Sequence, residues 1–197
     1  MAALNHPKKG STIKVEPLRD LKHIKSIKKL LADSPRDQAI FTIGINTNLR
    51  ASDLLKLKVG ELRHLAPGDH FELREKKTQK KRSITINKTV YDAVQSLFAS
   101  MPDASDDDYL FSSRKGGGPL SVPYLNALVK KWTGLINLRG NYGGHSLRKT
   151  FGYIHRTVFN TDIPTLMTMF NHSTQRQTLE YLCVQPDEIQ DAYLKEI

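Results

Sequence analysis

Hydrophobic residues recur at helical spacing along most of this chain. The first such run places Leu21, Ile24, Ile27, Leu30 and Leu31 on one helix face. A Ser34-Pro35 pair ends this predicted helix and begins another, because proline favours the first turn of a helix. Further helix-like stretches follow at residues 51–57, 89–99, 123–135, 146–158, 163–170, 174–184 and 187–196.

A β pattern interrupts the helices between residues 70 and 86. Residues 70–74 alternate between polar and apolar, a polar turn surrounds Thr78 and Gln79, and residues 83–86 alternate again. This pattern predicts a hairpin with a basic tip. We therefore predict a mainly α fold with a small antiparallel β-sheet, an α+β class.

The charge of the chain changes the range of expected partners. Its 197 residues are enough for one domain, and 30 Lys and Arg against 20 Asp and Glu give a formal net charge of +10. Such an excess favours a polyanionic partner, because basic side chains displace the counterions condensed on phosphates. Charge alone does not separate DNA from RNA, and a basic surface can also serve solubility alone.

Several classes of protein are excluded by what the chain lacks. The single cysteine, Cys183, excludes an internal disulfide framework and a multi-cysteine zinc site, and suits a reducing cytoplasm. No apolar run approaches the roughly 20 residues that span a bilayer. The first residues lack the hydrophobic region of a signal peptide and are predicted to form a flexible basic arm over residues 1–18. We expect a cytoplasmic protein with no membrane partner.

Six side chains could carry chemistry, although each has an ordinary explanation alone. They are Arg50 at a helix junction, Lys77 near the hairpin tip, His145 and Arg148 three residues apart, His172, and Tyr181 in an amphipathic helix. His145 and Arg148 would share one helix face. His172 precedes a helix whose predicted N-cap is Ser173 or Thr174.

Together, these positions carry a resemblance to a known family. The order is Arg, Lys, His-x-x-Arg, His, and then Tyr nine residues later. LRASDLLKL is similar to "LRxSELxxL", KTQKKRSITI to "KGxKxRxVPL", HSLRKTF to "HxLRHTF", and NHSTQRQTLEYL to "GHxSxxTTxxY". Over residues 19–184 the chain resembles the catalytic domain of the tyrosine recombinase, or phage integrase, family.

The resemblance implies site-specific DNA recombination by a metal-independent transesterification, with no cofactor. Tyr181 would attack the scissile phosphate and form a 3′-phosphotyrosyl link. Arg50, Arg148 and His172 would stabilise the charge on that phosphate. Lys77 would be the general acid, with Lys76 as its nearest rival, and His145 a general base or a group that positions the nucleophile.

The resemblance also implies a double-stranded DNA partner and an assembly. Further DNA contacts are expected from the basic side chains of the hairpin and from one beside Arg148: Arg74, Lys76, Lys80, Lys81, Arg82 and Lys149. We expect a monomer without DNA and a tetramer on it. The helical tail, residues 185–197, would dock on a neighbouring protomer or pack on its own domain. The separate N-terminal core-binding domain that the family usually carries is absent from the 197 residues.

Three departures and three alternatives accompany this interpretation. Asn171 stands where glycine is usual, Gly144 where threonine is common, and Lys149 where histidine is frequent; none is a catalytic side chain. The alternatives are a type IB topoisomerase, which shares the chemistry, a catalytically idle DNA-binding module, and an RNA-binding helical protein. Retention of all six side chains argues against an idle module, and no aromatic platform for RNA is evident.

Overall fold

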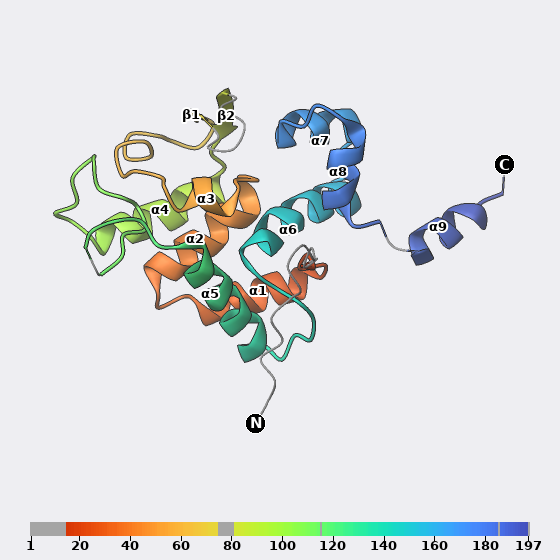
Figure 1. The fold of residues 1–197 in the computed structure, drawn as a ribbon, viewed down its shortest axis with the longest axis horizontal. Helices are drawn as coiled ribbons and strands as arrows, with labels where there is room; N and C mark the ends of the chain where they lie inside the picture. The colour runs from red at the N-terminus through yellow and green to blue at the C-terminus, as the bar shows by residue number, and fades with distance from the viewer. Residues whose placement is uncertain (1–14, 75–80, 115, 185, 197) are drawn as a thin grey trace, which may run out of the picture.

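The computed structural model describes residues 15–74, 81–114, 116–184 and 186–196, and its elements are labelled in Figure 1. Along the chain they are α1 (Leu21–Leu30), α2 (Pro35–Asn46), α3 (Ala51–Leu54), β1 (His70–Arg74), β2 (Lys81–Thr85), α4 (Lys88–Ala99), α5 (Val122–Leu135), α6 (Gly144–Thr157), α7 (Ile163–Phe170), α8 (Gln175–Leu182) and α9 (Pro186–Tyr193). The predicted class, mainly helical with a small antiparallel sheet, is confirmed.

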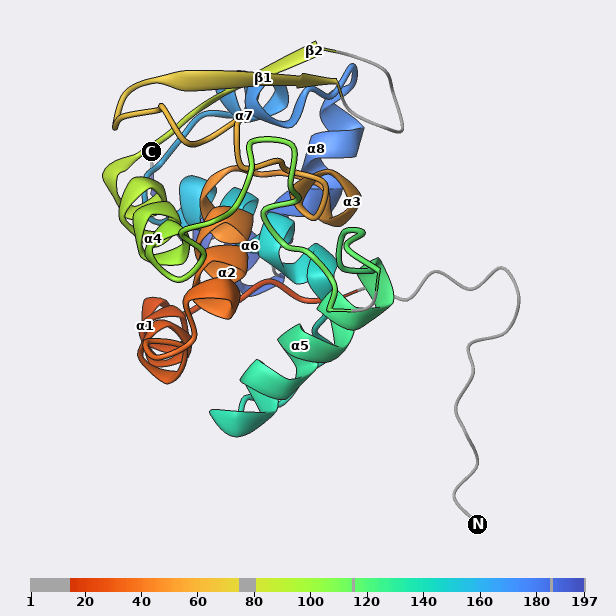
Figure 2. The same ribbon diagram turned by 90° about the vertical axis from the view of Figure 1, so that its left-hand side faces the viewer.

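Helix α2 forms the centre of the main core. Its middle residues, 39–44, are all buried, and the helix contacts α1, α3, α4 and α6 (Figures 1 and 2). Phe41 meets Trp132 of α5 edge-on, with ring centroids 5.9 Å apart. A Cβ on Gly44 would lie 2.6 Å from Leu147 Cδ1, so glycine allows α2 and α6 to approach closely. This packing fixes the position of α6.

A second, smaller core joins α6, α7 and α8. Its buried members are Phe151, Leu166, Phe170 and Leu182, and Tyr181 packs against it while remaining partly exposed. Asp162 caps α7 by accepting a hydrogen bond from Thr165 N at 2.8 Å, and Thr174 caps α8. The sequence prediction of Ser173 or Thr174 as the α8 N-cap is confirmed for Thr174.

The two-stranded sheet and α7 lie at one end of the molecule, and α1 and α5 lie at the other (Figures 1 and 2). The antiparallel register pairs His70 with Thr85 and Arg74 with Lys81. Phe71 and Ile84 face the core. The turn predicted around Thr78 and Gln79 lies outside the described residues.

Some boundaries differ from the sequence prediction. Helix α3 ends at Leu54 instead of residue 57, because Leu57 O and Val59 N bond to Leu110 N and Asp108 O instead of continuing the helix. Strand β2 begins two residues earlier than predicted, at Lys81, and α8 ends at Leu182 instead of residue 184. None of the helices in the described part of the chain is long and apolar enough to cross a membrane.

The ends of the chain also differ from the prediction. Leu18 is buried and its N–H donates to Thr150 Oγ1 at 2.8 Å, so residues 15–18 belong to the folded domain and not to a loose arm. Helix α9 projects away from the rest of the molecule (Figure 1), and Ile189, Tyr193 and Leu194 are exposed. These three apolar side chains of the tail are therefore largely left uncovered by the domain.

Candidate active site

Tyr181 and His145 face each other across the mouth of a groove. Tyr181 lies in the last turn of α8, and His145 lies in the first turn of α6. His145 Nε2 is 3.0 Å from Tyr181 Oη, and their ring centroids are 5.5 Å apart. This is hydrogen-bond distance, so the imidazole can accept the phenolic proton or donate to the phenolic oxygen, depending on its tautomer.

Arg148 lies one helical turn beyond His145 and is almost fully buried, with 1% of its surface exposed. Its guanidinium donates through Nη1 to Asn48 O and through Nη2 to Phe170 O, the latter at 3.1 Å. The Arg148 Cζ atom lies 5.0 Å from the Phe170 ring centroid and 5.2 Å from that of Tyr181. The positive charge is thus held in place directly beside the Tyr181 ring.

His172 completes this group from the loop between α7 and α8. Its ring stacks on Phe170 with centroids 5.1 Å apart, and its Nδ1 lies 3.1 Å from Oγ1 of the buried Thr178. Its Nε2 lies 3.5 Å from Arg148 Nη2, and its ring centroid lies 5.2 Å from that of Tyr181. Thr178 and Phe170 therefore fix the direction in which the imidazole points.

Arg50 lies at the start of α3, in a segment that bonds to Arg148. It is the N-cap of the short helix α3 and is half-buried. Asn48, two residues before Arg50, adopts a left-handed conformation, φ 54°, which asparagine tolerates better than most residues. Since Asn48 O accepts a hydrogen bond from Arg148, the segment that carries Arg50 is tied directly to α6.

Arg82 differs from its predicted role. Side chains of β2 alternate between exposed and buried, and Arg82 falls on the inner face with 9% of its surface exposed. Its guanidinium donates to Asn48 O at 2.9 Å and to Thr47 O at 3.0 Å. The prediction that Arg82 contacts DNA is corrected: Arg82 holds the segment before Arg50 in place.

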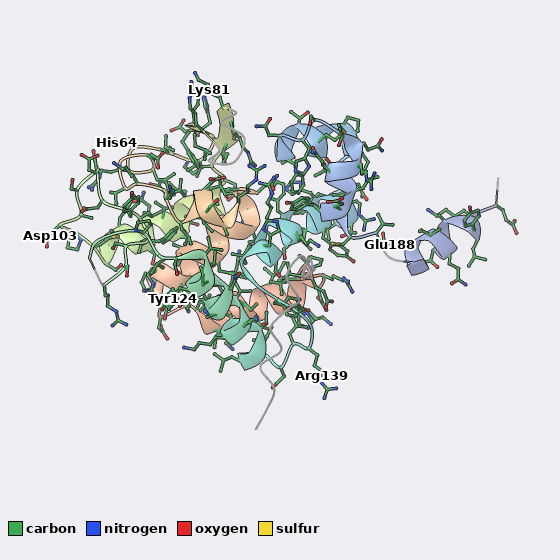
Figure 3. The ribbon with its side chains drawn as sticks, viewed as in Figure 1. His64, Lys81, Asp103, Tyr124, Arg139 and Glu188 are labelled. Carbon is green, nitrogen blue, oxygen red and sulfur yellow. The ribbon has the colours of Figure 1, made fainter. Side chains whose placement is uncertain are left out.

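The other predicted basic residues divide between two places. Arg74 and Lys81 are exposed and are cross-strand neighbours in the hairpin, where Figure 3 labels Lys81. Lys149 lines the groove beside His145. Lys76, Lys77 and Lys80 lie outside the described residues.

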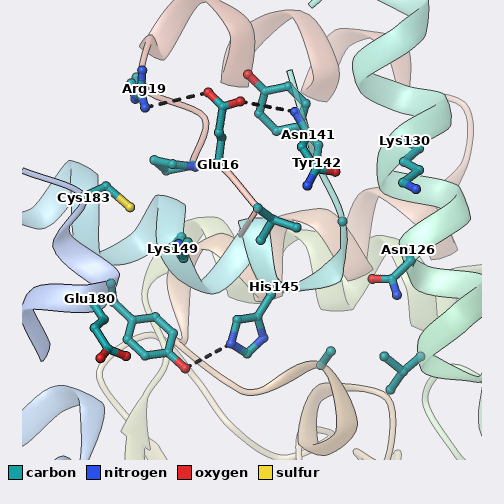
Figure 4. A pocket seen from close by; sticks show the side chains of 16 residues that line it. Glu16, Arg19, Asn126, Lys130, Asn141, Tyr142, His145, Lys149, Glu180 and Cys183 are labelled. Carbon is teal, nitrogen blue, oxygen red and sulfur yellow. Dashed lines mark hydrogen bonds and ion pairs between the residues drawn. The ribbon is translucent and has the colours of Figure 1, made fainter. Parts of the chain in front are cut away.

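The groove beside Tyr181 and His145 has a volume of about 1000 Å³ (Figure 4). Basic and amide side chains line it, among them Asn126 and Lys130 of α5 and Lys149 of α6. On the far side, Glu16 accepts a hydrogen bond from Asn141 N at 3.2 Å and lies 3.7 Å from Arg19 (Figure 4). The groove leads from the Tyr181 hydroxyl to a surface that is rich in cationic and amide groups.

Sequence reasoning did not find the residues that support the site from behind. Asn48, Phe170 and Thr178 each bond to or stack on a predicted site residue. Phe170 lies two residues before His172 and Thr178 six residues after it, but their spacing does not distinguish them from ordinary core residues. Within the described residues, no group of three or more His, Cys, Asp and Glu side chains is placed to hold a metal ion.

Known proteins resemble the chain along nearly its whole length. The model of the phage integrase family matches residues 18–188. A probable integrase/recombinase, YoeC of Bacillus subtilis (strain 168), is 34% identical over 180 residues, which cover 91% of this chain and 95% of the relative. Tyrosine recombinase XerC of Caldanaerobacter subterraneus subsp. tengcongensis is 31% identical over 176 residues, covering 85% of this chain but 48% of the relative.

Solved structures show the same fold. The XerH site-specific recombinase, crystallised with a palindromic difH substrate in a post-cleavage complex, superposes with a TM-score of 0.74 at 19% identity. The match covers 94% of this chain and 53% of that one. Because the family model spans most of the sequence and YoeC is similar over almost its full length, the chain belongs to the phage integrase family of tyrosine recombinases, which break and rejoin DNA.

Proposed function

We propose that this protein performs site-specific DNA recombination through a covalent link between Tyr181 and a 3′ phosphate, without a metal ion. The observation that carries the proposal is the 3.0 Å separation of Tyr181 Oη from His145 Nε2, beside the buried charge of Arg148. A phenol has a pKa of about 10 and is mostly protonated at neutral pH, so its attack needs a nearby group that can take the proton.

The proposed cleavage step is a balanced exchange of one ester for another. Tyr181 Oη bonds to the scissile phosphorus, the bond from phosphorus to the 5′ oxygen breaks, and the phenolic proton passes to His145. Lys77, or Lys76 as its alternative, protonates the departing 5′ oxygen. The phosphotyrosyl ester keeps the energy of the broken bond, so a 5′ hydroxyl from a second strand can reverse the step and join the DNA.

The positive charges around Tyr181 would stabilise the transition state. Negative charge builds on the non-bridging oxygens, and Arg50 and Arg148 stay charged at any working pH. His172 would donate a hydrogen bond to the same phosphate. These groups would supply the electrostatic stabilisation that a divalent metal supplies in many other phosphoryl-transfer sites.

Double-stranded DNA is the proposed partner. The net charge of +10 favours a polyanion, and the exposed Arg74 and Lys81 of the hairpin, with Lys149 in the groove, are the proposed phosphate contacts, together with Lys76 and Lys80. The substrate of XerH is palindromic, which fits copies of a protein bound about a two-fold axis. We propose a tetramer on DNA, a monomer without it, and a location in the bacterial cytoplasm.

Covalent capture from a randomised substrate tests the proposal without knowledge of the target site. The protein is incubated with a library of duplexes that carry a nick beside random sequence, and DNA that stays attached to protein in detergent is recovered. Loss of the short fragment after cleavage would trap the adduct. We expect capture by the wild-type chain and none by Tyr181→Phe.

The matched control is Tyr193→Phe, because Tyr193 lies on α9 with 87% of its surface exposed. It should capture DNA like the wild type. A persistent adduct with Tyr181→Phe would contradict the assignment of the nucleophile.

A further inference from the structure

Helix α6, which carries His145 and Arg148, begins without a capping side chain of its own. Its N-cap is Gly143 and its first residue is Gly144, one of the departures from the family pattern. The first N–H groups of a helix have no partner within the helix, and a Ser, Thr, Asp or Asn side chain at the N-cap usually accepts from one of them. Gly143 cannot do this, so the start of α6 requires an acceptor from another part of the chain.

Asn126 of α5 supplies this acceptor. Its Oδ1 accepts a hydrogen bond from Gly144 N at 2.7 Å, although the two residues lie 18 positions apart. The helices approach closely here, since a Cβ on Gly144 would lie 3.0 Å from Leu125 Cδ2. A Cβ on Gly143 would lie 3.0 Å from Asn126 Oδ1. The two glycines therefore leave the space in which a neighbouring helix caps α6.

The capped residue directly precedes His145, the group proposed to accept the Tyr181 proton. His145 is exposed, and its Nε2 lies 3.0 Å from Tyr181 Oη. An exposed side chain is not held by a core, so the backbone of the first turn of α6 largely determines where the imidazole lies. Helix ends open more readily than helix interiors. The bond from Gly144 N to Asn126 therefore holds the backbone that places the imidazole.

Asn126 also lines the groove in which DNA is proposed to lie, one helical turn from Lys130 (Figure 4). Its replacement can therefore act in two ways that a measurement separates. Loss of a direct DNA contact would raise the Kd for DNA. Loosening of α6 would instead lower the cleavage rate even when all of the protein is bound to DNA. The bond to Gly144 N favours the second effect, because the Asn126 carboxamide oxygen is engaged within the protein.

We propose that Asn126 is a positioning residue for His145. By capping α6 from α5, it holds the first turn of α6 in the place where the imidazole meets the Tyr181 hydroxyl. Without this cap the first turn opens, the imidazole is less often within reach of the phenolic proton, and attack on the phosphate slows while DNA still binds. This inference rests on the proposed roles of Tyr181 and His145.

Single-turnover cleavage at saturating DNA tests the proposal, with substrates recovered from the captured library. Asn126→Ala should slow cleavage by about tenfold, as a modest misplacement of a reacting group does, with little change in the Kd for DNA. Asn126→Asp keeps an oxygen for Gly144 N and adds a negative charge that a helix N-terminus favours, so it should cleave at close to the wild-type rate. Its Kd should rise, because the added carboxylate faces the groove. Equal rates for the two variants would overturn the proposal, as would an effect of Asn126→Ala that is confined to the Kd.

Asn87→Ala is the matched control, because it removes the same type of cap from a helix outside the site. Asn87 is the N-cap of α4, and its Oδ1 accepts from Val90 N at 2.9 Å. This variant should lose stability, as loss of an N-cap does, but should cleave at the wild-type rate. Slowing equal to that of Asn126→Ala would indicate a general loss of stability and would overturn the proposal.

A new cap at Gly143 should restore what Asn126→Ala removes. Gly143 has an extended conformation, φ −166°, which any residue adopts, and the Asn126 oxygen that would crowd a Cβ there is gone in this background. Adding Gly143→Ser gives α6 a side-chain acceptor at its own N-cap, for the N–H of the second or third helical residue. The double variant should recover most of the lost rate, and no recovery would overturn the proposal.

Hydrogen exchange gives a readout that does not depend on activity. Asn126→Ala should speed amide exchange in the first turn of α6, and Asn126→Asp should not. If the wild-type chain captured no DNA, the proposed function would fail, and this comparison would still decide whether Asn126 caps α6. Unchanged exchange in Asn126→Ala would contradict the capping role.

Discussion

Arg148 connects three parts of the chain that are distant in sequence. It projects from α6 and donates to the carbonyl groups of Asn48, before α3, and Phe170, at the end of α7. Its charge also lies beside the Tyr181 ring. One buried side chain therefore serves both the fold and the proposed chemistry, and its replacement should affect both.

Arg148→Ala should lower the cleavage rate by on the order of a hundredfold or more, the usual effect of removing a donor to a transition state. It should also lower the free energy of unfolding by about 1–3 kcal/mol, because the Phe170 carbonyl loses its Arg148 donor and the Asn48 carbonyl keeps only Arg82. Single-turnover cleavage and urea denaturation measure the two effects. Arg148→Lys keeps the charge but cannot reach both carbonyls, so it should cleave better than Arg148→Ala. Cleavage near the wild-type rate in Arg148→Ala would refute the role of Arg148.

Asn171 shows how a departure from the family pattern is accommodated. It ends α7 in a left-handed conformation, φ 55°, and directly precedes His172. Its side-chain Nδ2 is buried without a hydrogen-bond partner among the described residues, so the backbone conformation is the main demand at this position. Glycine and asparagine meet that demand at lower cost than other residues.

Replacing Asn171 therefore separates the backbone from the side chain. Asn171→Ala should lower the free energy of unfolding by about 1–2 kcal/mol, the cost of a left-handed conformation for an ordinary residue. Asn171→Gly should be neutral or stabilising. Urea denaturation of the two variants gives the comparison, and equal stabilities would show that the left-handed turn is not what requires asparagine.

At the scale of elements, the contact between α6 and α7 carries the site. Phe170 packs its ring against Phe151 and Arg148 of α6, and the rings of His172 and Tyr181 also lie beside it. A Cβ on Gly152 would lie 2.8 Å from Phe170 Cζ and 3.1 Å from Phe170 Cε2. The close approach of α6 and α7 therefore depends on the absence of a side chain at Gly152.

Gly152→Ala should lower the free energy of unfolding by about 1–3 kcal/mol through overpacking, and should slow cleavage because Phe170 shifts beneath Arg148 and His172. The matched control is Gly134→Ala in α5, where a Cβ would meet nothing within 4 Å. That change should stabilise the protein by up to about 1 kcal/mol through helix propensity. Thermal denaturation compares them, and a Gly152→Ala variant as stable as Gly134→Ala would contradict the close packing.

Periodicity predicts the helices and the hairpin well, because the spacing of hydrophobic residues within one segment shows which face of that segment is buried. It overestimated α3, since that helix ends where Leu57 and Val59 pair with residues some fifty positions later in the chain. It also placed Leu18 in an arm, although Leu18 is buried and bonded to Thr150. Contacts between distant segments leave no periodic trace, so these boundaries could not be read from the pattern.

For the site, sequence motifs predict the side chains that surround the Tyr181 hydroxyl better than the residues that hold those side chains in place. Tyr181, His145, Arg148 and His172 were singled out, and the structure brings these four together. Arg82 belongs to the same basic run as Lys81. Their roles differ because the alternation of side chains along β2 leaves Lys81 exposed and buries Arg82. Arg156 of α6 and Glu188 of α9 form an ion pair although they lie 32 residues apart, and no sequence motif could have paired them.

At the scale of the whole molecule, the net charge of +10 and the groove beside Tyr181 favour binding dominated by phosphate contacts. Affinity for DNA should fall steeply as salt rises, because binding releases counterions. Lys81→Gln and Lys149→Gln should each reduce the steepness of the plot of log association constant against log salt concentration by about one.

Two further variants serve as comparisons in the same fluorescence-anisotropy titrations. Lys88→Gln, whose lysine pairs with Asp92 at 2.7 Å on α4, should keep the wild-type slope. Arg82→Gln should also keep it but should destabilise the fold, because the Arg82 guanidinium bonds to backbone carbonyls. A flat salt profile for the wild-type chain would contradict phosphate-dominated binding.

The most direct test of the account is to identify the residue that becomes linked to DNA. Adducts formed by the wild-type chain on the nicked library in the presence of EDTA would be digested with nuclease and protease and analysed by mass spectrometry. The account predicts one modified peptide, with a nucleotide phosphate on Tyr181. A nucleotide on any other residue, or an adduct that forms only when a divalent metal is supplied, would contradict it.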